Sequence, residues 1–402
     1  MIPPAQAPLA GRRAAIGLSF AFILAAPVVY AGAIGMAALV SLAALIAFPR
    51  PALWGRLAPP SPGLIAAAAF LAWATLTLLW SPAEPRQILV AWAEAVLGCG
   101  LILAAAHLPD DLRTWPRLGF VVMTTALAVG LTVEAFSGGV VTALVKDLER
   151  YDARVLSMLG RGGAATIILA PAAAAMALDM GGRWKWAAWA ILGGAMAAAI
   201  GFEADANILA LIVAGSAFWF GHRRPGPAVM SFGLAFSAWL VLFPLGVLLA
   251  GPFIEPNRGE MPFSWEWRWE AWSYALELIA QKPLFGWGVD SARHFGDATV
   301  MMRGYELPRL PLHTHSASMQ IWLELGFAGV ALACAILVLG AWRVASSPRL
   351  HGRRAAAAAS TAVGTAFVLS TSYGFWQEWI WCTAILAAAA CFLVGPREGA
   401  KA

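Results

Sequence analysis

The chain has 402 residues, of which 60% are hydrophobic and only 12% are charged, and its mean hydropathy is +0.72. A soluble domain is about 45–50% apolar and about 25% charged, so this composition excludes a soluble globular protein and indicates an all-α polytopic membrane protein. The net charge of +5 does not indicate nucleic-acid binding. The four cysteines lie inside apolar segments without the spacing of a disulfide framework or a zinc site.

Twelve apolar segments are long enough to cross a bilayer, which needs about 20 mainly apolar residues. In chain order they are residues 14–31, 33–49, 63–80, 88–107, 116–136, 162–180, 185–201, 205–221, 228–251, 317–342, 354–372 and 376–395. We expect one membrane domain over residues 1–402 with about twelve transmembrane helices. The first segment lacks a cleavage site followed by a polar mature domain, so we interpret it as a retained span and not as a signal peptide.

The distribution of lysine and arginine predicts the orientation of these helices. With the N-terminus inside, the short outside connections carry only Arg86, and the short inside connections are rich in arginine. Positive charge concentrates on the cytoplasmic side of membrane proteins, so both termini are predicted to be cytoplasmic. The same orientation places two long loops outside, over residues 137–161 and 252–316.

Each long outside loop has a recognisable local pattern. In the first, residues 141–156 have apolar positions at helical spacing, which predicts an amphipathic helix along the membrane surface. In the second, a cluster of tryptophans precedes a Gly286-Trp-Gly288 turn. Residues 265–281 are predicted to be helical, and the helix should end before Pro283, because proline disfavours the helical conformation of its predecessor.

The second long loop ends with two histidines, immediately before a predicted span. Ser316 is a good N-cap, so His315 should lie beside the positive end of a helix dipole, which favours the neutral imidazole. A neutral imidazole at a membrane boundary is a candidate general base. The alternative is an interfacial histidine without a catalytic role. His313 is predicted to be a positioning or a solvated residue.

Arginines in both long loops are candidates for binding phosphate. Arg161 stands between glycines at the end of the first loop, and Arg268 lies in the predicted helix of the second. The planar guanidinium group suits phosphate oxygens and stays charged when partly buried. The alternative for each is an interfacial anchor or an ion-pair partner. Arg293, Arg303 and Arg309 are secondary candidates.

A carboxylate also falls inside the span that follows the histidines. Glu324 lies nine residues after His315, and therefore about two and a half turns deeper on the same helix. Because charge inside a membrane is costly, we expect Glu324 to organise a polar network, or else to fix helix packing by an internal ion pair or hydrogen bond. No metal-binding motif is present, and no cofactor is expected.

At these residues the chain resembles the O-antigen ligase and polymerase superfamily. The ligase pattern is His, then Asn, Ser or Gln, then nine residues and Gly-x-x-Gly, Thr or Tyr, and His315-Ser316 followed by Gly326-Phe-Ala-Gly329 fits it. The segments 268–272 and 283–288 are similar to the family's Arg-x-x-x-Trp helix and its Gly-x-Gly turn. One departure lies near Asp205, where many members carry a Ser-Arg pair and this chain has none. What replaces that pair is left open.

The resemblance implies a GT-C-like glycosyltransferase of the bacterial inner membrane, acting in lipopolysaccharide biosynthesis with its active site facing the periplasm. Its implied donor is a glycan on undecaprenyl pyrophosphate, and its acceptor is a sugar hydroxyl of lipid A–core. It further implies a metal-independent, inverting transfer, with part of the active site on residues 252–316. His315 would be the base, and Arg161 and Arg268 would bind pyrophosphate. A polymerase of the same superfamily is one alternative, and a twelve-helix transporter or flippase is another.

Overall fold

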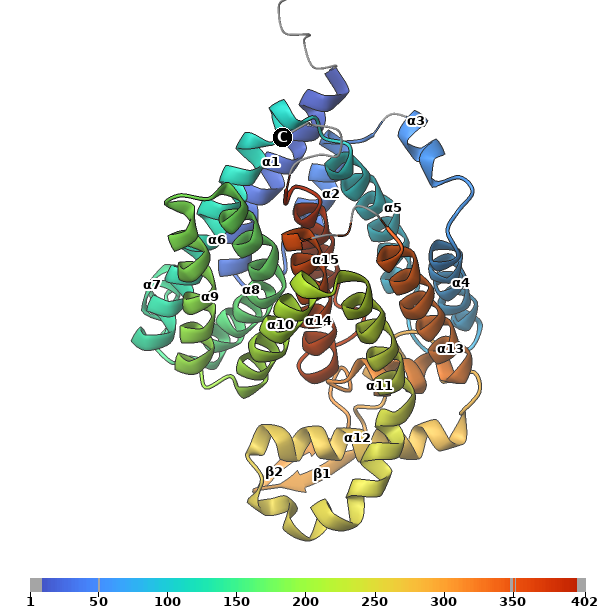
Figure 1. The fold of residues 1–402 in the computed structure, drawn as a ribbon. Helices are drawn as coiled ribbons and strands as arrows, with labels where there is room; N and C mark the ends of the chain where they lie inside the picture. Colours follow the sequence, from blue (N-terminus) through green and yellow to red (C-terminus); the bar gives the residue numbers. More distant parts are fainter. Residues whose placement is uncertain (1–8, 50, 348–349, 351, 396–402) are drawn as a thin grey trace, which may run out of the picture.

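The computed structural model describes residues 9–49, 51–347, 350 and 352–395. The termini predicted to be cytoplasmic fall partly on residues 1–8 and 396–402, which lie outside this described part. Helices make up most of the described chain (Figure 1). The α-helices are α1 Leu9–Tyr30, α2 Met36–Ile46, α3 Pro51–Trp54, α4 Pro62–Leu76, α5 Arg86–Ala106, α6 Thr114–Ser137, α7 Val140–Lys146, α8 Ala153–Met180, α9 Trp184–Gly201, α10 Asp205–Arg223, α11 Pro225–Ile254, α12 Phe263–Gln281, α13 Ala317–Ala345, α14 Gly352–Thr371 and α15 Glu378–Cys391. Short 3-10 helices are η1 Gly55–Leu57, η2 Thr77–Leu79, η3 Asp110–Leu112, η4 Glu255–Glu260 and η5 Ser291–His294.

The helical class predicted from the sequence agrees with this structure. Each of the twelve predicted segments coincides with a helix. Within the described residues, seven helical segments are long and apolar enough to cross a membrane: Leu9–Tyr30, Pro62–Leu79, Arg86–Ala106, Asp110–Ser137, Ala153–Met180, Pro225–Glu260 and Ala317–Ala345. Helices α2 and α15 are apolar but shorter. The number of twelve crossings and the GT-C-like architecture therefore stay predictions.

Helix α8 is the most enclosed of these segments. It is rich in alanine and glycine, and small residues let neighbouring helix backbones approach closely. At Gly162 a Cβ atom would lie 2.9 Å from the carbonyl oxygen of Val29, so α1 packs directly on the α8 backbone. Helix α8 also contacts α6, α9, α14 and α15. This packing fixes the position of Arg161, which lies in its third turn.

The first long loop does not fold as predicted. The expected continuous helix over 141–156 is wrong, because Asp147 and Tyr151 adopt left-handed conformations with φ of 52° and 64°. These residues separate α7 from α8, and the Asp152 side chain caps α8 by accepting from the Arg154 N–H at 2.7 Å. Helix α8 thus begins nine residues before the predicted start of the span at 162, and Arg161 belongs to the helix and not to a loop.

The second long loop folds into a cap across one end of the bundle. Figure 1 shows α12 lying crosswise there, with the hairpin of β1 Thr299–Met302 and β2 Tyr305–Pro308 beside it. The two strands are antiparallel, with Thr299 opposite Pro308. Helix α12 ends at Gln281, as the sequence predicts. Trp272 donates to the carbonyl oxygen of Thr314 at 2.8 Å, which ties α12 to the segment that carries the histidines.

Helix α13 is interrupted where it meets the 283–288 loop. Gly326 has φ 64° and ψ −167°, a conformation that is essentially restricted to glycine. The Trp287 and Gly288 N–H groups donate to the carbonyls of Leu323 and Glu324 at 2.9 and 2.8 Å. The Phe327 N–H in turn donates to the Pro283 carbonyl at 2.9 Å. The interruption therefore leaves these backbone groups paired and joins the loop firmly to α13.

Candidate active site at the α12 end of the bundle

His315 stands at the start of α13 with a defined tautomer. The predicted N-cap is confirmed, because the Ser316 side chain accepts from the Met319 N–H at 3.5 Å. The Nδ1 atom of His315 lies 2.8 Å from the backbone carbonyl oxygen of Ser372. A carbonyl oxygen can only accept, so Nδ1 carries the hydrogen and Nε2 keeps its lone pair. Nε2 is therefore the basic atom of this side chain.

The imidazole of His315 is neutral near pH 7. Burial lowers its pKa to about 4, the hydrogen bond to Ser372 acts in the opposite direction, and the positive charge of Arg268 lowers the pKa further. The expectation of a neutral base agrees with this direction. The main cause is burial, whereas the sequence suggested the helix dipole.

His313 lies against His315. The two ring centroids are 4.2 Å apart with the rings nearly perpendicular, and Nδ1 of His313 accepts from the His315 backbone N–H at 3.3 Å. Burial lowers the pKa of His313 to about 3, aided by the charges of Arg293 and Arg268. The side chain is half-buried and oriented by a hydrogen bond, which fits the positioning alternative and not the solvated one.

Arg268 presents a positive charge without a carboxylate partner in the described part of the chain. Its guanidinium carbon lies 5.2 Å from the centroid of the Trp265 ring, and one terminal nitrogen donates to the Ser264 carbonyl at 3.2 Å. Its Nε–H is buried and, among the described residues, has no hydrogen-bond partner. Burial lowers the pKa of Arg268, yet arginine stays protonated. A half-buried cation with a buried, unpaired N–H favours a bound anion.

Arg161 faces the same region from α8. It donates to the Gly32 carbonyl at 3.0 Å and to the Ser157 hydroxyl at 3.1 Å, both of which are neutral groups. Burial raises the pKa of Tyr373 to about 12, and the charges of Arg161 and Arg268 both oppose that rise. Tyr373 therefore lies within the electrostatic influence of both arginines, although they are far apart in the sequence.

The secondary arginines are paired with carboxylates. Arg303 lies 2.8 Å from Glu266, and Arg309 lies 2.5 Å from Glu270, so these two pairs fasten the hairpin to α12. Arg293 lies 2.8 Å from Asp290. Their charges are largely compensated within the protein. Among the five arginine candidates, Arg161 and Arg268 are the ones whose described contacts are with neutral groups.

Glu324 is fully buried and organises the polar network expected of it. Its carboxyl group accepts from the backbone N–H of Asp290 at 3.0 Å, the amide of Gln320 at 3.1 Å and the indole of Trp376 at 2.5 Å. The oxygen of the Gln320 side chain accepts from the Phe375 N–H at 2.7 Å. This network holds the segment that carries Ser372 against α13, and thus supports the hydrogen bond to His315.

Two residues in this region escaped the sequence analysis. Tyr373 lies in the polar turn Ser-Tyr-Gly between the last two helices, and that turn was the available signal. Gln320 lies one turn before Glu324, where an amide within an apolar segment was the signal. Near Asp205, where the family's arginine is missing, Asn207 is buried, and a Cβ atom at Gly163 would lie 3.3 Å from its amide nitrogen.

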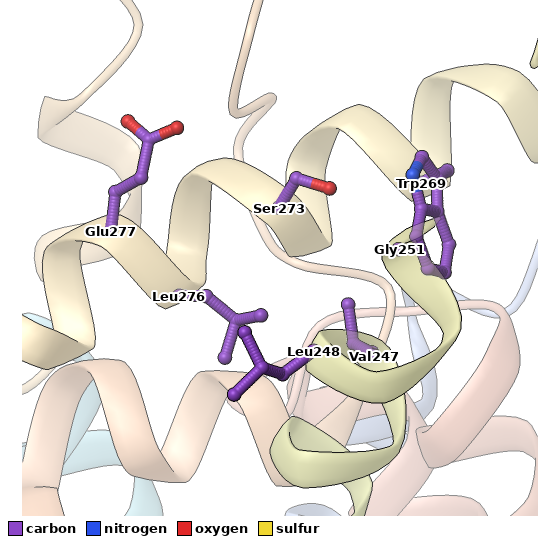
Figure 2. A pocket seen from close by; sticks show the side chains of 7 residues that line it. All are labelled: Val247, Leu248, Gly251, Trp269, Ser273, Leu276 and Glu277. Carbon is purple, nitrogen blue, oxygen red and sulfur yellow. The ribbon is translucent and has the colours of Figure 1, made fainter. Parts of the chain in front are cut away.

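An apolar pocket of about 350 Å³ lies between α11 and α12. In Figure 2 Leu248 and Leu276 face each other across it, and the Glu277 carboxyl points away. Its other lining residues are Val247, Gly251, Trp269 and Ser273. This lining suits a hydrocarbon group and not an anion.

Comparison with known proteins agrees with this chemistry. Residues 203–334 match the family model described as O-antigen ligase, a region that includes Arg268, His315 and Glu324. This part of the chain is similar to the O-antigen ligase family. The chain is also similar to proteins of Rickettsia prowazekii (strain Madrid E) and Rickettsia typhi (strain ATCC VR-144 / Wilmington) that are named as candidate polysaccharide ligases. The identities are 33% and 32% over 111 residues, which is 27% of this chain. The match also spans 27% of the length of each of these relatives.

Proposed function

We propose that this protein is an O-antigen ligase. It transfers a glycan from undecaprenyl pyrophosphate to a sugar hydroxyl of lipid A–core, at the periplasmic face of the bacterial inner membrane. The observation that carries this proposal is the hydrogen bond from His315 Nδ1 to the Ser372 carbonyl, which leaves Nε2 basic within the electrostatic influence of Arg268.

The proton transfer begins at the acceptor. His315 Nε2 takes the proton from the acceptor hydroxyl while the oxygen of that hydroxyl forms a bond to the anomeric carbon of the glycan. The bond between that carbon and the pyrophosphate oxygen breaks, and its electron pair leaves with undecaprenyl pyrophosphate. A single displacement of this kind inverts the anomeric centre.

The arginines act on the leaving group. Negative charge grows on the pyrophosphate as the bond breaks, and preorganised cations stabilise that charge most when they lie in a water-poor site. Arg268 offers a buried Nε–H without a partner among the described residues, and Arg161 adds a second guanidinium group. Because these cations can supply the charge that a metal ion would otherwise provide, we expect a metal-independent reaction.

A reconstituted transfer reaction tests the proposal. Purified protein is incubated with glycan-linked undecaprenyl pyrophosphate and lipid A–core, and the joined product is detected by its mass and by gel mobility. We expect product with the wild type, none with His315→Ala, and no effect of EDTA. Growth of the glycan on undecaprenyl pyrophosphate without lipid A–core would instead indicate the polymerase. Loss of transfer in EDTA, restored by a divalent ion, would contradict the metal-independent mechanism.

A further inference from the structure

Tyr373 lies within the candidate active site and has no role in the mechanism above. It belongs to the segment 372–377 that joins α14 to α15. On one side of it, the Ser372 carbonyl accepts from His315. On the other, Gly374 packs so closely on His313 that a Cβ atom there would lie 3.0 Å from the histidine Cβ. Both neighbours of Tyr373 are therefore held by the two histidines.

The phenol of Tyr373 points towards α8. A Cβ atom at Gly160, the residue before Arg161, would lie 3.9 Å from the Tyr373 hydroxyl oxygen. The ring is braced by Trp379, with centroids 4.9 Å apart and the rings nearly perpendicular. These contacts hold the Tyr373 hydroxyl beside the turn of α8 that carries Arg161.

The Tyr373 hydroxyl makes no hydrogen bond to the described residues and can therefore donate to a ligand. Within the residues that the structure describes, no hydrogen bond reaches its oxygen, and the side chain is half-buried. Burial raises the pKa of this phenol to about 12, so it keeps its proton near pH 7. An anion that attracts both guanidinium groups would satisfy this O–H as well.

We propose that the Tyr373 hydroxyl donates a hydrogen bond to the phosphate group that Arg161 and Arg268 bind. This inference rests on the proposed function, because it names a third contact to the same pyrophosphate. A hydroxyl donor of this kind stabilises a phosphate oxygen without adding charge to the site. Tyr373 would then touch the leaving group directly, whereas Gln320 and Glu324 act only by holding its segment in place.

The test is binding of undecaprenyl pyrophosphate, without a glycan, to purified protein in detergent. Tyr373→Phe removes only the hydroxyl and keeps the ring on Trp379, so the fold should be retained. A hydrogen bond to a charged group predicts a rise of roughly 10- to 100-fold in the dissociation constant. Tyr305→Phe, at the exposed end of β2, is the matched control and should bind like the wild type.

The outcomes separate this inference from the proposed function. If Tyr373→Phe binds as tightly as the wild type, the hydroxyl makes no contact with phosphate and the inference is wrong, while the ligase proposal stands. If the wild type itself fails to bind undecaprenyl pyrophosphate, the site binds no pyrophosphate and both proposals fall. If binding weakens as expected but the wild type transfers no glycan to lipid A–core, the Tyr373 contact stands and the ligase assignment fails.

Discussion

At the scale of single residues, the reactivity of His315 depends on one hydrogen bond and on burial. The Ser372 carbonyl fixes the tautomer, and His313 braces the backbone of His315. Removing the base should therefore cost far more than removing its neighbour. We expect His315→Ala to lower the transfer rate by about 10²- to 10⁴-fold, and His313→Ala to lower it less. Steady-state transfer with both variants checks this. An inactive His313→Ala beside an active His315→Ala would identify the other histidine as the base.

The pH dependence of transfer follows from the same burial. The pKa of His315 is lowered to about 4, so the neutral, basic form predominates above that value and is lost as pH falls through it. We expect kcat/KM to stay level from about pH 8 down to about pH 5, and to fall below that as Nε2 is protonated. The pH profile of kcat/KM measures this directly. A decline centred on pH 6.5, the ordinary value for histidine, would mean that His315 is solvated or is not the base.

The two arginines should be needed for binding the donor and not for binding the acceptor. Removing a charge that pairs with a buried phosphate costs about 2 kcal/mol or more, which is roughly a 30-fold rise in the KM for the donor. We expect this for Arg161→Ala and Arg268→Ala. Lysine should restore binding only in part, because it lacks the planar fork. The matched control is Arg154→Ala, an exposed arginine in the first turn of α8 that pairs with Asp152. A normal KM for the donor in both alanine variants would contradict the proposal that these arginines bind pyrophosphate.

At the scale of elements, the join between α13 and the 283–288 loop depends on glycine. A Cβ atom at Gly326 would lie 2.5 Å from the Leu284 backbone, and the backbone conformation there is one that other residues avoid. We expect Gly326→Ala to destabilise the protein by about 2–4 kcal/mol. Gly340→Ala, in the same helix at a position where an added Cβ atom would meet nothing within 4 Å, should change stability by about 1 kcal/mol or less. Thermal unfolding in detergent compares the stabilities of the two variants. Equal unfolding midpoints would contradict the claim that the junction between α13 and the 283–288 loop depends on Gly326.

At the scale of the whole molecule, the cap of α12 and the hairpin lies at one end of the bundle, and α13 leads away from it (Figure 1). We predict that the cap is periplasmic. A cysteine at Ser264, which is exposed in the first turn of α12, should react with a membrane-impermeant thiol reagent in cells with a permeable outer membrane. A cysteine at Ser346, exposed beyond α13, should react only after the inner membrane is opened. The reverse pattern would overturn the predicted orientation.

The amino-acid sequence by itself determined the helices and the chemical types at the site. Long apolar segments form helices wherever they lie, because in a membrane each backbone polar group must be paired within its own segment. The N-cap at Ser316 and the end of α12 before Pro283 were predicted for similarly local reasons. The break between α7 and α8 was not predicted, because it depends on contacts such as that of Gly138 with the Tyr151 ring.

Only the tertiary structure decided which of the candidate residues meet. Arg161 and Tyr373 lie on helices or turns more than half the chain apart, and they become neighbours because α8 packs against α14 and α15. The same packing sets the tautomer of His315, since its partner is a backbone carbonyl that no side-chain motif specifies. It also separates Arg303 and Arg309, which are paired with carboxylates, from Arg268, which is not. Local sequence fixes what each residue can do, whereas burial and long-range contacts determine its charge, its partner and its pKa.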